Sequence, residues 1–232
     1  MISYQYTYLI GNIFALAIWL FFFFRRKDTR KEMLIISIIF GIMGLLVESV
    51  YIYDWWQPLT ITGTAIGLED FLFGFLFGGV AAVFYEHLFN KKIKSKKVKK
   101  LGETRRNIQF SFLIILMILI FFISFFIFNL NSFISTIFAF IIPIAIIYFK
   151  RKDLIKDSII SGILTLITAI IIYQILNFIT PGFFNEFWFY QNIGQITIFK
   201  IPLEEIIWFI LAGAFIGPLY EYWKEGKLIK NK

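Results

Sequence analysis

The stretch GLEDFLFGFLFGGVAAVFYEHL, residues 67–88, decides the fold and raises the question of function. It is long and apolar enough to form a helix that crosses a membrane, which needs about 20 residues. It nevertheless begins with two adjacent carboxylates, Glu69 and Asp70, and carries Tyr85 and Glu86 near its other end. These acids need an explanation, because carboxylates are rare in membrane-spanning helices.

A second stretch, PLEEIIWFILAGAFIGPLYEYW at 202–223, repeats the pattern without a gap at an offset of 135 residues. Two apolar helices would share Leu and Phe by chance, but an acidic pair, a glycine and a Tyr-Glu at one spacing indicate an internal repeat. A weaker similarity relates IIFGIMGLL from Ile38 to IISGILTLI from Ile159. The strongest matches are Glu69-Asp70 with Glu204-Glu205, Gly78 with Gly213, and Tyr85-Glu86 with Tyr220-Glu221.

The whole chain has the composition of an integral membrane protein. Of its 232 residues, 59% are hydrophobic and 16% are charged, and the mean hydropathy is +0.78. A soluble domain of this size could not bury so much apolar surface. Seven segments are predicted to span the membrane: Tyr8–Phe24, Met33–Tyr53, Leu68–Asn90, Ile108–Phe128, Phe133–Phe149, Ile159–Ile179 and Ile201–Trp223.

The basic residues predict the orientation. All but one of the 23 Lys and Arg residues fall in three loops, Arg25–Glu32, Lys91–Arg106 and Lys150–Asp157, and in the tail after Trp223. Basic loops stay in the cytoplasm, so the N-terminus is predicted outside and the C-terminus inside. The first span, with a basic block only after it, is expected to remain in the mature protein. Short basic blocks between apolar runs argue against a nucleic-acid partner.

We therefore predict an all-α polytopic protein with seven transmembrane helices in two parallel three-helix repeats. The first repeat comprises residues 1–90, a basic loop and a linking helix comprise 91–132, and the second repeat comprises 133–232. The linking helix lets the second repeat begin on the same side as the first, so the axis relating them lies along the membrane normal. A multi-pass protein of a prokaryotic plasma membrane is expected.

The four acids of the two repeats have two interpretations. Carboxylates in a first helical turn cap free N–H groups, and Pro202 suits a first helical position, so capping alone is one reading. However, adjacent helical positions point about 100° apart, so one acid of each pair can cap while the other faces a cavity between the repeats. Nearby carboxylates and apolar walls favour a retained proton, which could attack an electron-rich double bond. Aromatic faces would stabilise the resulting carbocation.

Further residues of the predicted site lie on the same helices. Glu48 is an ionisable residue at membrane depth and thus a functional candidate, although an acid at the membrane interface is the alternative. Glu48, Trp56, Phe73 and Trp208 are predicted substrate contacts, with an interfacial aromatic belt as the other reading of Trp55-Trp56. Glu86 and Glu221 are predicted about 24 Å along their helices from the acidic pairs, paired with nearby lysines.

At these residues the sequence resembles the integral-membrane lycopene cyclase domain family, the heterodimeric or fused carotenoid cyclase type with tandem three-helix repeats. Members of that family carry a Pro-x-Glu-Glu or Glu-Asp motif in each repeat. PLEEIIWF from Pro202 fits it, whereas GLEDFLFG has Gly67 in place of the proline. The RRKDTRKEML block and the YDWWQP segment are also similar to the family.

The resemblance implies an enzyme, an intramolecular lyase or isomerase that cyclises the end group of lycopene to an ionone ring without net redox change. The implied catalytic acids are Glu69, Asp70, Glu204 and Glu205. Neither cofactor nor metal is expected: the chain has no cysteine, a single histidine (His87) and no dinucleotide-binding fingerprint. The expected partners are a hydrophobic carotenoid in the bilayer and lipid, besides other carotenoid-pathway enzymes or a second copy of the chain.

Two other functions fit the same pattern. A non-catalytic binder of a carotenoid or isoprenoid would have the same cavity but no turnover to lose when the acids are changed. A proton- or cation-coupled transporter with parallel repeats would have helices broken at matching positions of both halves. Gly78 and Gly213 match, but Pro218 has Val83 as its counterpart. Prenyl transfer is disfavoured, because the chain has no Asp-rich motif for magnesium and diphosphate.

Overall fold

A computed structural model of the chain describes residues 3–95 and 100–231, so residues 96–99 of the predicted basic block lie outside the described residues. Seven helical segments in it are long and apolar enough to cross a membrane, which confirms the seven predicted spans and the all-α class. Their ends differ from the predicted ends by a few residues. The segments are Tyr4–Arg25, Arg30–Asp54, Leu68–Leu88, Lys100–Phe126, Ser132–Lys150, Lys152–Ile179 and Leu203–Lys224.

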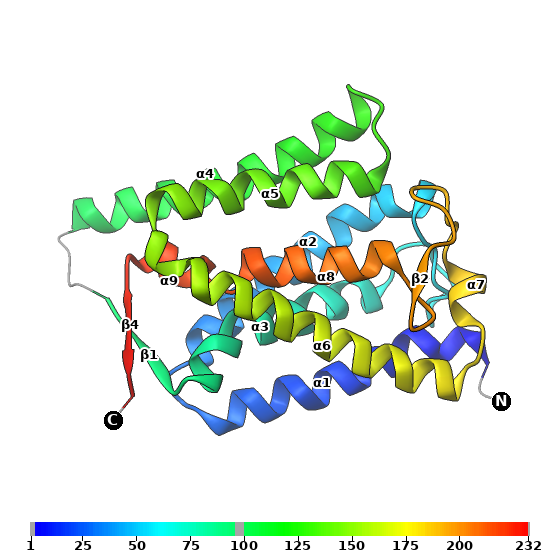
Figure 1. Cartoon of the computed structure of the whole chain (residues 1–232), viewed down its shortest axis with the longest axis horizontal. Coiled ribbons are helices and arrows are strands. Elements are labelled where there is room, and N and C mark those ends of the chain that lie inside the picture. Colours follow the sequence, from blue (N-terminus) through cyan, green and yellow to red (C-terminus); the bar gives the residue numbers. More distant parts are fainter. Residues whose placement is uncertain (1–2, 96–99, 232) are drawn as a thin grey trace.

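The helices run side by side along the long axis of the molecule (Figure 1). The N-terminus, α7 (Phe183–Phe187) and β2 (Thr197–Ile198) lie at one end, here called the N-terminal end of the bundle. The C-terminus lies at the other, the C-terminal end. The helices that build the spans are α1 (Thr7–Arg25), α2 (Arg30–Asp54), α3 (Leu68–Leu88), α4 (Lys100–Phe126), α5 (Ser132–Lys150), α6 (Ile155–Ile179), α8 (Leu203–Ile216) and α9 (Leu219–Lys224).

Helix α3 lies inside the bundle and contacts α1, α2, α6 and α8. Small residues permit this position: a Cβ atom added at Gly74 would lie only 2.1 Å from the backbone oxygen of Phe40 on α2. The outer helices expose large apolar side chains such as Phe21, Ile38 and Phe149. Helices that are apolar on both their inner and outer faces are typical of membrane spans, because the outer face meets lipid.

The two halves pack their helices through equivalent contacts. A Cβ atom added at Gly78 would meet Phe40 at 2.6 Å, and one added at Gly213 would meet Thr165 at 2.4 Å. The pairs α2–α3 and α6–α8 therefore correspond, with Phe40 equivalent to Thr165. The weaker sequence alignment matched Phe40 with Ser161, so it was wrong by one helical turn.

The seventh span is broken, whereas its counterpart is continuous. Helix α8 ends at Ile216 and α9 begins at Leu219, with Gly217 and Pro218 between them. Proline lacks the N–H that would continue the helix. Helix α3 runs unbroken over Leu68–Leu88, so the matched breaks expected of a transporter do not occur.

Two arginines organise the C-terminal end in the same way. Arg26 donates from Nη1 to the carbonyl of Glu86 at 2.6 Å and from Nη2 to the carbonyl of Lys91. Arg151 donates to the carbonyl of Glu221 at 3.2 Å and to that of Gly226 at 2.7 Å. Arg26 thus ties the end of α3 to β1, and Arg151 ties α9 to the residue before β4. The strands β1 (Lys91–Lys94) and β4 (Lys227–Lys230) pair antiparallel, a sheet that the sequence did not predict.

The predicted pairing of Glu86 and Glu221 with lysines was wrong. Both carboxylates are fully buried, and neither forms an ion pair with a lysine in the part of the chain that the structure describes. The salt bridges described at this end pair arginines with Asp28, Asp153 and Glu225 instead, such as Arg26 with Asp28 at 2.5 Å. The hydrogen bond from Arg26 is the main reason that the pKa of Asp28 lies below its usual value.

Candidate functional site

Each acidic pair lies in the first turn of its helix, and its two members point in different directions. Helix α3 starts at Leu68 after the N-cap Gly67, and α8 starts at Leu203 after Pro202. The sequence predicted Pro202 as the first residue of the helix, but Pro202 lies one residue before it. All four acids are buried, with at most 7% of any of them exposed.

The first acid of each pair holds the loop that precedes its helix. Glu69 accepts a hydrogen bond at Oε1 from the N–H of Ile61 at 2.7 Å. Glu204 accepts one at Oε1 from the N–H of Ile193 at 3.2 Å. Neither residue lines the central cavity described below. Glu69 and Glu204, although predicted as catalytic acids, therefore lie outside the cavity that Asp70 and Glu205 line.

The second acid of each pair faces the central cavity. Asp70 accepts from the Tyr8 hydroxyl at 2.9 Å through Oδ1 and from the N–H of Gly67 at 2.7 Å through Oδ2. Asp70 therefore both caps the start of α3 and lines the cavity, so the two interpretations of the acids hold together for this residue. This carboxylate is fixed by one side chain from α1 and by the start of its own helix.

Glu205 is surrounded by hydrogen-bond donors from other elements. Its Oε1 accepts from the indole N–H groups of Trp55 at 2.9 Å and Trp188 at 3.1 Å. Its Oε2 accepts from the Tyr173 hydroxyl at 2.8 Å. Among the described residues, Glu205 is bonded to three donors and to no acceptor, which matches a carboxylate that carries its negative charge.

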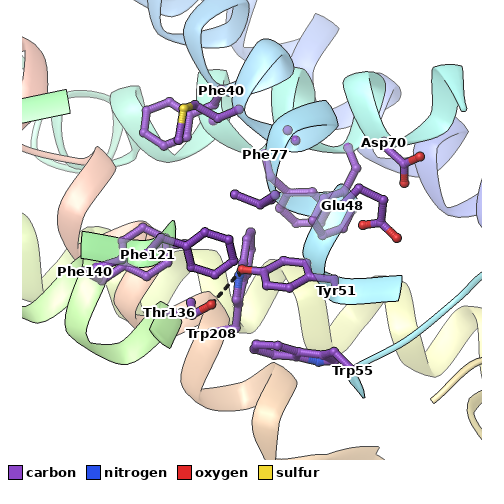
Figure 2. A pocket seen from close by; sticks show the side chains of 18 of the residues that line it. Phe40, Glu48, Tyr51, Trp55, Asp70, Phe77, Phe121, Thr136, Phe140 and Trp208 are labelled. Carbon is purple, nitrogen blue, oxygen red and sulfur yellow. Dashed lines mark hydrogen bonds between the residues drawn. The ribbon is translucent and has the colours of Figure 1, made fainter. Parts of the chain in front are cut away.

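The central cavity has a volume of about 90 Å³ and lies between the two halves, with walls from α2, α3, α4, α5 and α8. Figure 2 shows aromatic side chains around it, with the carboxylates of Glu48 and Asp70 at one side. All four predicted substrate contacts line it. The lining residues that matter below are Tyr8, Glu48, Tyr51, Trp55, Trp56, Asp70, Phe73, Phe77, Phe140, Glu205 and Trp208.

Glu48 contributes a third carboxylate to the cavity. It is 3% exposed, and its Oε1 has no hydrogen-bond partner among residues 3–95 and 100–231. It interacts electrostatically with Asp70 and Glu205. This burial argues against a Glu48 side chain that extends outward to water at the membrane interface.

The aromatic walls are held in fixed contacts. Phe73 packs against Trp208 with ring centroids 5.6 Å apart and against Trp56 at 6.3 Å. Trp208 donates from Nε1 to the Tyr51 hydroxyl at 3.1 Å, and this hydroxyl lies 2.9 Å from Thr136 Oγ1 (Figure 2). Such a wall presents ring faces to whatever occupies the cavity, and ring faces attract cations.

Several residues of the site were missed or misread in the sequence. Trp55 and Trp56 are 1% and 8% exposed, so they do not form an interfacial belt. Tyr8 and Tyr173 were missed, although a hydroxyl within an apolar helix is a signal that a partner is needed. Trp188 belongs to the long loop before α8, where no local pattern indicates that its ring reaches Glu205.

Two loops close the N-terminal end over the cavity. The N–H of Gln57 donates to the carbonyl of Phe187 at 2.8 Å, and that of Phe189 donates to the carbonyl of Trp55 at 2.9 Å. Tyr190 lies in the same loop, where burial, together with the charges of Glu204 and Glu205, raises its pKa. The site is therefore an apolar chamber whose polar groups are mainly carboxylates and their donors.

The family model described as lycopene cyclase matches residues 5–88 and 131–223. The chain belongs to the lycopene cyclase family. A comparison with curated proteins and another with solved structures found no match. The two matched segments contain α1–α3 and α5–α9, and each includes one acidic pair.

Membership of the lycopene cyclase family supports a carotenoid cyclase function in general terms and confirms the resemblance seen in the sequence. The seven apolar spans agree with a multi-pass membrane protein that meets a hydrophobic substrate in the bilayer. Both the family and the geometry direct attention to the same chamber, which holds Asp70, Glu205 and Glu48.

Proposed function

We propose that the chain cyclises the end group of a linear carotenoid of the lycopene type by acid catalysis, as an isomerase without net redox change. The observation that carries this proposal is the pair Asp70 and Glu205, buried on opposite repeats and facing one aromatic cavity. We also propose that residues 1–90 and 133–232 are two parallel repeats joined by the linking helix, since their helices make equivalent contacts.

The proposed reaction balances without a cofactor. A carboxylic acid gives its proton to the terminal double bond of the substrate, which leaves a carbocation. The neighbouring double bond attacks this cation, a carbon–carbon bond forms, and the ring closes. A proton is then lost to a carboxylate or water, so the product is an isomer of the substrate.

The hydrogen bonds suggest different roles for the three carboxylates. Glu205, with three donors, is suited to remain charged and to stabilise the cation. Glu48, with a free Oε1, and Asp70, with few donors, are suited to hold and transfer the proton. Glu69 and Glu204, predicted as catalytic acids, are proposed instead as positioning residues that hold the loops over the site.

The test is expression in a bacterial host that accumulates lycopene, followed by chromatography of the carotenoids. The wild-type protein is expected to give ring-containing products, and Asp70→Asn and Glu205→Gln to lower their yield about 100-fold or more, the size of a general-acid or charge contribution. Glu103→Gln, an exposed acid far from the cavity, is the matched control. Protein levels in the membrane are measured by immunoblot.

Two results would reject the proposal. Unchanged lycopene with the wild-type protein present in the membrane would contradict cyclisation. Co-purification of unchanged lycopene with the wild-type protein and with both variants would instead indicate a carotenoid-binding protein. Solvent deuterium adds a direct check: membranes in D₂O should yield product with one deuterium per ring formed, because the initiating proton comes from an acid that exchanges with solvent.

A further inference from the structure

A second group of buried carboxylates lies at the C-terminal end of the bundle, away from the central cavity. Glu32 of α2, Glu86 of α3 and Glu221 of α9 each bring one oxygen to within 4.8 Å of the others. Their exposed fractions are 3%, 0% and 0%. Asp157 of α6, also buried, interacts electrostatically with Glu86 and with Glu221. Four carboxylates from four helices therefore converge here.

This group, here called the C-terminal carboxylate cluster, relates the two halves. Glu86 and Glu221 occupy equivalent positions of the repeat. Glu32 and Asp157 occupy equivalent positions as well, in the register that matches Phe40 with Thr165. The cluster thus lies where the two halves meet, and each half supplies two of its carboxylates.

The carboxylates of the cluster form no ion pair among the described residues, and the charge of Arg26 acts on Glu32 and Glu86 only from a distance. Both oxygens of Glu86 and of Glu221, and Oε1 of Glu32, have no hydrogen-bond partner among the described residues. Arg26 and Arg151 lie nearby, but they donate to backbone carbonyls and to the carboxylates of Asp28 and Asp153. An ionised carboxylate buried without a partner costs several kcal/mol or more, so something else must neutralise this group.

The cluster is reached through a cavity of about 300 Å³ at the C-terminal end. Glu32 and Glu86 line it, so the cavity leads up to the cluster, although the unpartnered oxygens themselves are buried. Lys31, Lys92 and Lys224 also line the cavity, but none forms an ion pair with the cluster where the chain is described. A ligand that neutralises the cluster must therefore be small enough to pass these lysines and must itself carry positive charge.

We propose that the C-terminal carboxylate cluster binds one divalent cation that prefers oxygen ligands, such as Mg²⁺, Mn²⁺ or Ca²⁺. Carboxylate oxygens are the ligands these ions favour, at about 2.0–2.6 Å from the metal, so oxygens up to about 5 Å apart can share one ion. The oxygen separation of the three glutamates meets this limit. The ion would join α2 and α3 of the first half to α9 of the second and so lock the two halves together.

The test uses the purified full-length protein in detergent, stripped with EDTA and desalted, with Mn²⁺ as the probe. Free Mn²⁺ is measured by electron paramagnetic resonance during titration. We expect one Mn²⁺ per chain for the wild-type protein, displaced by Mg²⁺ or Ca²⁺. Glu86→Gln and Glu221→Gln are expected to weaken binding at least tenfold, while Glu103→Gln, an exposed acid at the same end, leaves it unchanged.

Size-exclusion chromatography establishes that each variant is folded. If neither Glu86→Gln nor Glu221→Gln elutes as a single species, Glu32→Gln, at the wall of the cavity, takes their place with the same expectation. Absence of stoichiometric Mn²⁺ binding by the wild-type protein, or binding unchanged in the folded variants, would overturn the proposal. Either result would leave protons shared among the carboxylates as what neutralises the cluster. Neither result depends on cyclase activity, so this proposal and the proposed function can fail separately.

Discussion

Among single residues, Glu48 and Tyr173 show how the two halves of the site differ. They occupy equivalent positions on α2 and α6 in the register set by Phe40 and Thr165. In the first half this position supplies a second carboxylate beside Asp70. In the second half it supplies a hydroxyl that donates to Glu205 at 2.8 Å. One half is therefore suited to deliver a proton and the other to hold a negative charge.

Replacing Tyr173 tests this division. Tyr173→Phe removes one of three donors to Glu205, and a hydrogen bond to a charged group contributes about 1.5–3 kcal/mol. We expect cyclised product to fall roughly tenfold or more, measured as initial rate per amount of membrane protein. The control is Tyr53→Phe, which changes an exposed tyrosine at the end of α2 that lies at the N-terminal end of the bundle. Equal rates in the two variants would contradict a role for Tyr173 in holding Glu205.

The first acids of the two pairs give a second prediction at this scale. A glutamine can still accept the bond from Ile61 or Ile193 through its amide oxygen, whereas it cannot give a proton as an acid does. Glu69→Gln and Glu204→Gln are therefore expected to keep activity within about threefold of wild type, while Glu69→Ala and Glu204→Ala lose tenfold or more through the released loop. Loss of activity in the Gln variants equal to that of Asp70→Asn would instead make these acids catalytic.

Among the helices, the close packing of α2 on α3 rests on glycine. A Cβ atom at Gly74 would lie 2.1 Å from the backbone oxygen of Phe40, which cannot move without moving its helix. Gly74→Ala is expected to destabilise the protein by about 1–3 kcal/mol, the usual cost of overpacking. The measurement is the midpoint of thermal aggregation in detergent by fluorescence-detected chromatography.

Gly11→Ala is the matched control for Gly74→Ala. The added methyl group there would meet only the Leu176 Cδ1 atom, at 3.1 Å, and this is the end of a flexible side chain. We expect a small change in the midpoint. A drop equal to that of Gly74→Ala would mean that the two helix contacts do not differ in tightness.

The elements also show what could be predicted from the sequence. The spans could, because each depends only on its own apolar length. The strand Lys91–Lys94 could not, because a run of lysines carries no strand pattern and pairs with a segment far along the chain. The acidic pairs were found by their repetition, but which acid faces the cavity depends on helix rotation against neighbours. The donors Trp55 and Trp188 come from loops whose path is set by tertiary contacts.

For the whole molecule, the two ends of the bundle carry different groups. The N-terminal end carries the proposed chemistry beneath two loops joined by backbone hydrogen bonds. The C-terminal end carries the two arginines, the short sheet that joins the halves and the carboxylate cluster that lies between them. Since loops cover the first end, we expect an apolar substrate to enter between helices from the lipid.

The orientation of the molecule in the membrane is the last prediction. Basic loops at the C-terminal end predict that this end faces the cytoplasm, so the loops over the site face outward. The chain has no cysteine, so single cysteines report position without background. Glu186→Cys, exposed at the N-terminal end, is expected to react with a membrane-impermeant maleimide in intact cells. Lys27→Cys, exposed at the other end, is expected to react only after the cells are permeabilised.

The opposite labelling pattern would reverse the topology, and it would place the proposed acids on the cytoplasmic side, where their exchangeable protons would follow the internal pH. Labelling of both positions in intact cells would indicate leaky membranes or mixed insertion, and a periplasmic and a cytoplasmic marker protein distinguish these two. A carboxylic acid that starts each cycle must then recover a proton, and the nearest water is on the side of the membrane that the covering loops face. The orientation thus decides which compartment supplies the proton for the proposed cyclisation.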